Sequence, residues 1–158
     1  MKDPERTPSG EAVTQLILST FRANGLLLGA GDLLSADAGL TSARWQVLGA
    51  VVLEKRPLTV PQIARRMGLT RQSVHATVQR LVREGLLELG SNQDHRRSAL
   101  VFLTERGLAS YRAVDAGQVA WVNRLARGVK RSDVETAVRV LDYLSSRLEE
   151  DREGGRES

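Results

Sequence analysis

The chain has 158 residues, of which 41% are hydrophobic and 4% aromatic, and it contains no cysteine. This length suits one ordinary domain, and the scarcity of aromatic residues favours helices over a β-sandwich or barrel. Without cysteine the chain has no disulfide, no Cys-ligated zinc and no thiol redox switch, and two histidines make a metal site unexpected. We therefore expect one mainly α-helical domain without a cofactor.

The net charge of +4 is concentrated in the middle of the chain. Residues 55–106 hold ten Lys or Arg and four Asp or Glu, whereas the remainder is net negative. This distribution suits a polyanionic partner. The start of the chain lacks the pattern of a signal peptide, and the longest apolar run, 26–30, is far too short to span a membrane. We expect a cytoplasmic protein with no membrane partner.

A long first helix is predicted over residues 11–36, because apolar side chains recur there at helical spacing. Residues 1–10 are expected to be flexible. Gly25, Gly29 and Gly31 would each weaken a helix, so they predict a kink or a close approach of another backbone. A second helix is predicted from Ser42 to about residue 54, capped by Thr41 and ended by Pro57.

Two short helices follow, joined by only three residues. Thr59 and Gln62 have the spacing of a capping box, which begins a helix that ends at Gly68. Thr70 caps the next helix, whose apolar positions fall on one side and which ends at Gly85.

A β-hairpin is predicted next, with strands at 86–89 and 99–103 around a polar loop. Thr104 then caps a long helix that runs to about Arg127. Ser132 and Glu135 predict a capping box for a last helix with near-heptad apolar spacing, and residues 149–158 are expected to form a disordered tail.

The order of these elements is that of a winged helix-turn-helix, here at about residues 40–106. In that fold the second helix of the pair enters the major groove of DNA. The outer face of this helix has small or hydrogen-bonding residues and no acidic one, as base edges and phosphates require. The candidate DNA-binding residues on it are Arg71, Gln72, Ser73, His75, Ala76, Thr77, Gln79 and Arg80.

Two alternatives remain open for this face. Any one of these side chains, and His75 in particular, could simply belong to a solvated helix surface. In the hairpin loop, Arg96 and Arg97 could enter a narrow minor groove, although a charged turn alone would be unremarkable.

The sequence resembles the multiple-antibiotic-resistance regulator (MarR) family. The resemblance spans about residues 11–148 and lies in Leu40-Thr41, Trp45 and Leu48, then Ile63-Ala64 and Leu69-Thr70, then Leu81 and Gly85-Leu86, and finally Leu103-Thr104-Glu105-Arg106-Gly107. The family's wing signature, Asp-x-Arg before Leu-Thr, places Arg97 at the arginine and His95 at the aspartate. Asp94 is displaced by one residue, so Arg96 and Arg97 share the assignment.

The resemblance implies that helices 11–36 and 105–148 form a homodimer interface. Their continuous apolar faces indicate the same, because one small core could not cover them, although a monomeric bundle is the alternative. Two reading helices related by a two-fold axis predict an inverted-repeat operator in double-stranded DNA.

The family also implies repression that is released by a small aromatic or anionic effector, bound near residues 27–34, Trp45 and the helix after Thr104. Trp45 is the candidate ligand-binding residue, with a core role as the alternative. An enzyme is disfavoured, because no catalytic constellation or phosphate-binding loop is present. The stronger rival is a winged-helix protein-interaction module that does not bind specific DNA.

Overall fold

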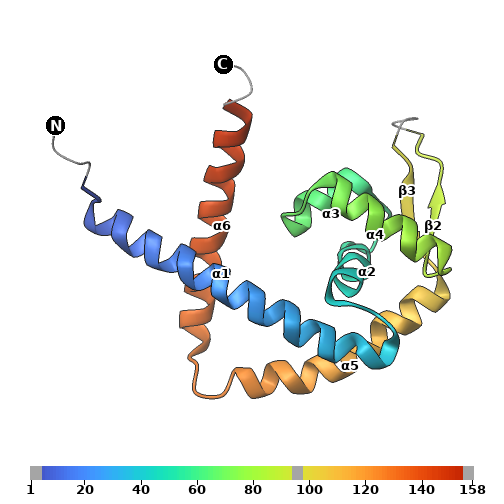
Figure 1. Ribbon diagram of the computed structural model, residues 1–158, viewed down its shortest axis with the longest axis horizontal. Coiled ribbons are helices and arrows are strands. Elements are labelled where there is room, and N and C mark those ends of the chain that lie inside the picture. The colour runs from blue at the N-terminus through green and yellow to red at the C-terminus, as the bar shows by residue number, and fades with distance from the viewer. Residues whose placement is uncertain (1–4, 94–97, 155–158) are drawn as a thin grey trace. The chain divides into compact units, whose positions relative to one another are not determined.

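The computed structural model describes residues 5–93 and 98–154, and it is mainly helical with a small three-stranded sheet (Figure 1). The predicted fold class is confirmed. The chain divides into two units, residues 1–118 and 119–158, which are described separately. The elements are α1 (Pro8–Ser35), η1 (Ala36–Ala38), α2 (Ser42–Glu54), β1 (Leu58–Thr59), α3 (Val60–Met67), α4 (Arg71–Arg83), β2 (Leu87–Gly90), β3 (Leu100–Leu103), α5 (Glu105–Leu125) and α6 (Arg131–Gly154).

Helix α1 begins earlier than the sequence suggested, because Thr7 caps it and accepts a hydrogen bond from Gly10 N at 3.0 Å. Residues 8–10, expected to be flexible, are therefore helical, and residues 1–4 lie outside the described residues. Its other end is held against α2. Asp32 Oδ1 accepts from Ser42 N at 2.6 Å, and a Cβ added at Gly31 would lie 2.6 Å from Ser42 Oγ. Gly31 thus provides the close approach that its position predicted.

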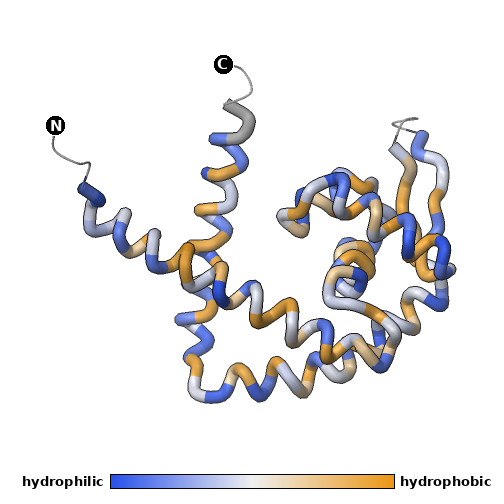
Figure 2. The backbone as a smooth tube through the Cα atoms, in the orientation of Figure 1, coloured by the Kyte–Doolittle hydropathy of each residue, from blue (hydrophilic) through white to orange (hydrophobic). Residues whose placement is uncertain are grey.

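The core of the first unit is centred on α2, which packs against α1, α3, α4 and β3. Apolar residues at helical spacing on α2, α3 and α4 turn inward and are joined by residues of the sheet (Figure 2). The buried core consists of Leu40, Val47, Leu48, Ala50, Val51, Leu58, Ile63, Ala64, Val74, Val78, Leu81, Leu86, Leu87, Val101 and Val114.

The sheet has the order β1-β3-β2 and is antiparallel throughout. The hairpin β2–β3 was predicted, and it pairs Leu87 with Leu103. Strand β1 was not predicted. It is only two residues long, pairs Leu58 with Val101 and runs directly into α3, so no local alternation marks it in the sequence.

The junction between α4 and α5 explains the Thr-Glu-Arg-Gly segment of the resemblance. Thr104 Oγ1 donates to Gly85 O at 2.8 Å and accepts from Gly107 N at 3.0 Å, so one hydroxyl closes α4 and opens α5. Arg106 Nη1 donates to Glu84 O at 3.0 Å. A Cβ at Gly107 would lie 2.0 Å from Leu86 O, so only glycine permits this contact.

The second unit contains the end of α5, a turn with Gly128 at φ 80°, and α6. Two expectations are corrected here. Helix α6 begins at Arg131, so Ser132 lies inside the first turn instead of capping it, and Glu135 pairs with Arg131 Nε at 2.6 Å. Residues 149–154 continue α6 and are not a disordered tail, while residues 155–158 lie outside the described residues.

We predict that Gly107→Ala lowers the free energy of unfolding by about 2 kcal/mol, because the added methyl group would overlap the Leu86 carbonyl. Urea denaturation at fixed protein concentration measures this change. Gly25→Ala is the matched control, since a Cβ there meets nothing within 4 Å. It should keep or raise stability by up to about 1 kcal/mol. Equal midpoints for the two variants would contradict the assignment of the close contact.

Candidate nucleic-acid interface

Helix α4 is positioned by signals that lie within its own sequence. Thr59 and Gln62 form the predicted capping box of α3, and Gly68 ends α3 in the left-handed region at φ 63°. Thr70 then begins α4, its hydroxyl accepting from Ser73 N at 3.1 Å. Val74, with the other apolar residues of its face, is buried, which turns the opposite face outward.

The predicted reading residues lie mostly on this outward face. Six of them are exposed: Arg71, Gln72, Ser73, His75, Ala76 and Arg80. Thr77 and Gln79 are half-buried, and Thr77 Oγ1 donates to Ser73 O at 3.1 Å, so these two side chains are less available. The exposed surface of α4 therefore starts at its N-terminus, where backbone N–H groups also favour phosphate.

Arg71 and Gln72 differ from Arg80 in what holds them. Among the described residues, neither Arg71 nor Gln72 has a hydrogen-bond or ion-pair partner. Arg80 Nε instead lies 3.2 Å from Glu84 Oε1. Arg71 and Gln72 can accordingly bind a base edge without breaking a protein contact, whereas Arg80 must leave a carboxylate.

Glu84 also holds an arginine that sequence reasoning missed. Arg44 on α2 is 8% exposed, pairs through Nη2 with Glu84 Oε2 and donates from Nη1 to Gly39 O at 2.9 Å. Burial, and secondarily the charge of Arg80, lower the pKa of Arg44 from its ordinary value. A signal was present: Arg44 precedes Val47 and Leu48 by three and four residues, which places it on the inner face of α2.

Further cations on the helix-turn-helix were not singled out from the sequence. Arg65 on α3 and Arg83 on α4 are exposed. Arg66 is also exposed but pairs with Glu54, which is shared with Arg56 Nε at 3.5 Å. Their signal was the charge of the middle of the chain, which the sequence analysis used only in total.

The wing is described only at its base. Asn92 Nδ2 donates to Ser98 O at 3.0 Å and so ties the two ends of the loop together. The predicted wing arginines Arg96 and Arg97, together with Asp94 and His95, lie outside the described residues. Their contact with DNA stays a prediction.

A pocket of about 470 Å³ lies beside Trp45, walled by α2, α3 and α5. Its lining residues are Trp45, Gln46, Gly49, Ala50, Leu53, Arg66, Met67, Tyr111, Asp115 and Gln118. Residues 27–34 of α1, which were expected to line a ligand site, are not among them. They miss it because α1 meets α2 at Ser42, at the start of that helix.

Tyr111 and Asp115 are coupled in the wall of this pocket. Burial raises the pKa of Tyr111 first, and the charge and hydrogen bond of Asp115 raise it further. Trp45 Nε1 is buried without a hydrogen-bond partner among the described residues. The pocket thus combines aromatic walls with one anionic and one cationic side chain, Asp115 and Arg66.

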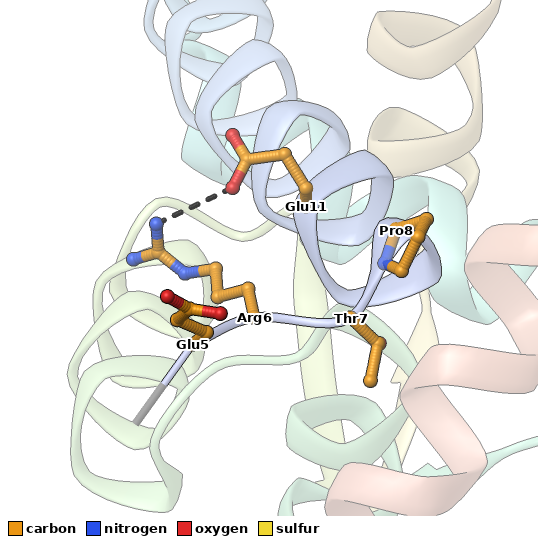
Figure 3. Close-up of a pocket in the computed structure, with 5 residues that line it drawn as sticks. All are labelled: Glu5, Arg6, Thr7, Pro8 and Glu11. Atoms are coloured by element: carbon orange, nitrogen blue, oxygen red, sulfur yellow. Dashed lines mark hydrogen bonds and ion pairs between the residues drawn. The ribbon is translucent and has the colours of Figure 1, made fainter. Parts of the chain in front are cut away.

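A second hollow, at the start of α1, has a simpler structure (Figure 3). It surrounds the cap of the helix, and Arg6 Nη1 lies 3.4 Å from Glu11 Oε2 across it, with both side chains exposed. An exposed ion pair beside a helix cap is ordinary surface structure. Among residues 5–93 and 98–154, no cluster of three or more potential metal ligands occurs, and no helix could span a membrane.

The fold and the basic, acid-free face of α4 define a winged helix-turn-helix DNA-binding protein. A model of the MarR family matches residues 38–98, from η1 through the base of the wing. The chain belongs to the MarR family and is a DNA-binding transcriptional regulator. Members of this family regulate transcription and are not enzymes.

Similar proteins support this assignment. An uncharacterized protein of Mycobacterium tuberculosis, Rv2011c, is 43% identical over 119 residues, which cover 75% of this chain and 82% of the relative. The structure of the regulator BldR from Sulfolobus solfataricus is similar with a TM-score of 0.77 at 20% identity, covering 90% of this chain and 99% of that one. CouR from Rhodococcus jostii RHA1, bound to p-coumaroyl-CoA, has a TM-score of 0.73 at 22% identity, with coverage of 89% and 96%. Both structures show the same fold.

We predict that the phenol of Tyr111 titrates above its ordinary pKa and that Asp115→Asn lowers the pKa, because the substitution removes a negative charge beside the phenol. Absorbance at 295 nm in a Tyr143→Phe background isolates Tyr111. The raised pKa contributes stability that is full below the unfolded pKa and is lost as the pH rises through the folded pKa. Asp37→Asn is the control and should leave the midpoint unchanged. A midpoint that Asp115→Asn does not lower would refute the coupling.

Proposed function

We propose that the protein acts as a homodimer that binds an inverted-repeat operator in double-stranded DNA. Each copy would place α4 in the major groove. The observation that carries this proposal is the outward face of α4, where Arg71 and Gln72 are exposed, unpaired among described residues and adjacent to the helix N-terminus. Arginine and glutamine can bind guanine and adenine edges through two hydrogen bonds each. Arg96 and Arg97 would contact the minor groove from the wing.

The exposed apolar surface of α1 supports a homodimer. Phe21 is 70% and Leu33 is 82% exposed, and only Gly31 and Ser35 of α1 are buried in a single copy. Helix α6 shows the same pattern, since none of its residues from 131 to 151 is buried. Helices with such faces gain most of their stability from packing, so a second copy of the chain is their expected cover.

Two-fold symmetry then sets the operator. Reading helices that meet successive major grooves on one side of the duplex lie about 34 Å apart, which is one helical turn. The half-sites should therefore be inverted and separated by about one turn.

The pocket beside Trp45 is our candidate effector site, and repression that its ligand releases is the regulation we propose. Its volume of about 470 Å³ lies in the usual range for small molecules. Aromatic walls suit an aromatic ligand, as in CouR, which was solved with p-coumaroyl-CoA. Asp115 disfavours an anion, and Arg66 is already paired with Glu54. We therefore favour a neutral or weakly charged aromatic effector over a carboxylate.

We predict that Arg71→Ala and Gln72→Ala each relax base preference at particular operator positions. Loss of a paired base contact should cost about 1 to 3 kcal/mol on the preferred base and little on others. The operator is obtained by selection from random duplexes, and single-base variants of it are then compared by fluorescence anisotropy at fixed salt concentration.

Arg112→Ala is the control for this experiment, because Arg112 is exposed on α5, away from the reading face. It should leave both affinity and preference unchanged. A uniform loss across all sequences from Arg71→Ala and Gln72→Ala would place the reading face elsewhere. DNA affinity that does not fall with rising salt would refute the interface itself.

We predict that an aromatic ligand changes the fluorescence of Trp45 and releases operator DNA in the same concentration range. A Trp121→Phe background leaves Trp45 as the sole indole. p-Coumaramide is compared with p-coumarate, and the neutral amide should bind more tightly. Arg66→Gln separates the alternatives, since it should weaken the carboxylate alone. Changes in fluorescence without any effect on DNA binding would make the pocket a ligand site without a regulatory role.

A further inference from the structure

The second unit carries opposite charges at the two ends of α6. Residues 124–131 contain Arg124, Arg127, Lys130 and Arg131 and no acidic residue, whereas Glu149, Glu150 and Asp151 are consecutive. All seven side chains are exposed. Cations at the start of a helix and anions at its end oppose the helix dipole. The favourable Asp133 in the first turn only partly offsets this, so α6 alone does not account for the arrangement.

An exposed apolar stripe connects these two ends. Val134, Val138, Leu141 and Leu148 recur every three or four residues and are 49%, 50%, 37% and 64% exposed. Hydrophobic segments alternate with polar ones along α6 in Figure 2. This spacing is typical of a helix that pairs with another helix along its length.

We propose that α6 pairs with α6 of a second copy in an antiparallel arrangement. The basic end of each helix then lies against the acidic end of its partner. This inference rests on the proposed homodimer and specifies one of its contacts. Charge complementarity selects this occupant, because α1 carries mixed charges, such as Arg6 and Glu11 in one turn, and offers no block of one sign.

The apolar and charged patterns share one centre, which is a separate argument for the pairing. A two-fold axis at Leu141 places Val134 opposite Leu148, and Val138 opposite Leu144, so apolar residues meet along the stripe. Leu144 is itself the half-buried residue of α6 between 131 and 151.

The same axis brings the charged ends together. Arg131 lies opposite Asp151 of a second copy, and Lys130 lies within one turn of Glu150. Pairs within one chain compete only weakly. Arg131 contacts Glu135 at 2.6 Å and Glu150 contacts Arg147 at 3.9 Å, both at exposed positions where an ion pair contributes little.

The test reverses the charge of one end at a time. The basic-end variant is Lys130→Glu/Arg131→Glu, and the acidic-end variant is Glu150→Lys/Asp151→Lys. Each puts like charges together at both ends of the pair, because symmetry counts every substitution twice. Sedimentation at low salt should show the dimer dissociation constant raised about tenfold or more for each variant. The variant with all four substitutions should return to within about threefold of the wild type.

Mixing the two variants gives a second readout. The heterodimer restores attraction at both ends, so native mass spectrometry should find it well above the statistical share of about half. Arg65→Glu/Arg83→Glu is the control, with the same change of charge on the helix-turn-helix, and should dimerise like the wild type. A variant that loses helix content alone but regains it on mixing supports the pairing as well.

The outcomes separate this inference from the homodimer. A wild-type protein that stays monomeric at micromolar concentration would refute the homodimer. A wild-type dimer whose two variants mix statistically, with no recovery in the fourfold variant, would overturn the antiparallel α6 pair and leave the homodimer standing.

Discussion

The position of the reading helix depends on a buried ion pair between Arg44 and Glu84. Arg44 projects from α2, the centre of the core, and Glu84 follows α4 directly. Arg106 at the start of α5 binds the backbone carbonyl of the same Glu84. Three helices therefore meet at one residue. A buried charge is stable only when it is paired, so this contact fixes where α4 ends relative to the core.

Glu84 also restrains the DNA-facing side of α4, because its second oxygen holds Arg80. The two arginines are not equivalent. Arg80 is exposed and can exchange Glu84 for a phosphate at small cost, whereas Arg44 would be left as an unpaired buried charge. On DNA, Arg80 is thus the arginine that can move, and the end of α4 stays anchored through Arg44.

Local signals in the sequence predicted most of the helix-turn-helix. Thr59, Gln62, Gly68 and Thr70 each act within a few residues of where they stand, so their caps could be found without tertiary information. Features that need distant partners were missed. Strand β1 exists only through pairing with β3, and Arg44 meets a carboxylate forty residues away. The start of α6 was misplaced because a capping motif at Ser132 was taken as sufficient.

The pocket illustrates the same limit and shows how ligand and DNA could be coupled. Trp45 was found, but its other walls come from α3 and α5, which only the fold brings together. Two lining residues, Arg66 and Met67, end α3, one short turn before α4 begins at Arg71. Because Glu84 anchors the far end of α4, a ligand that displaced the end of α3 would act mainly on the start of α4. Arg71 and Gln72 lie there, so a signal in this pocket would reach the residues that are free to contact bases.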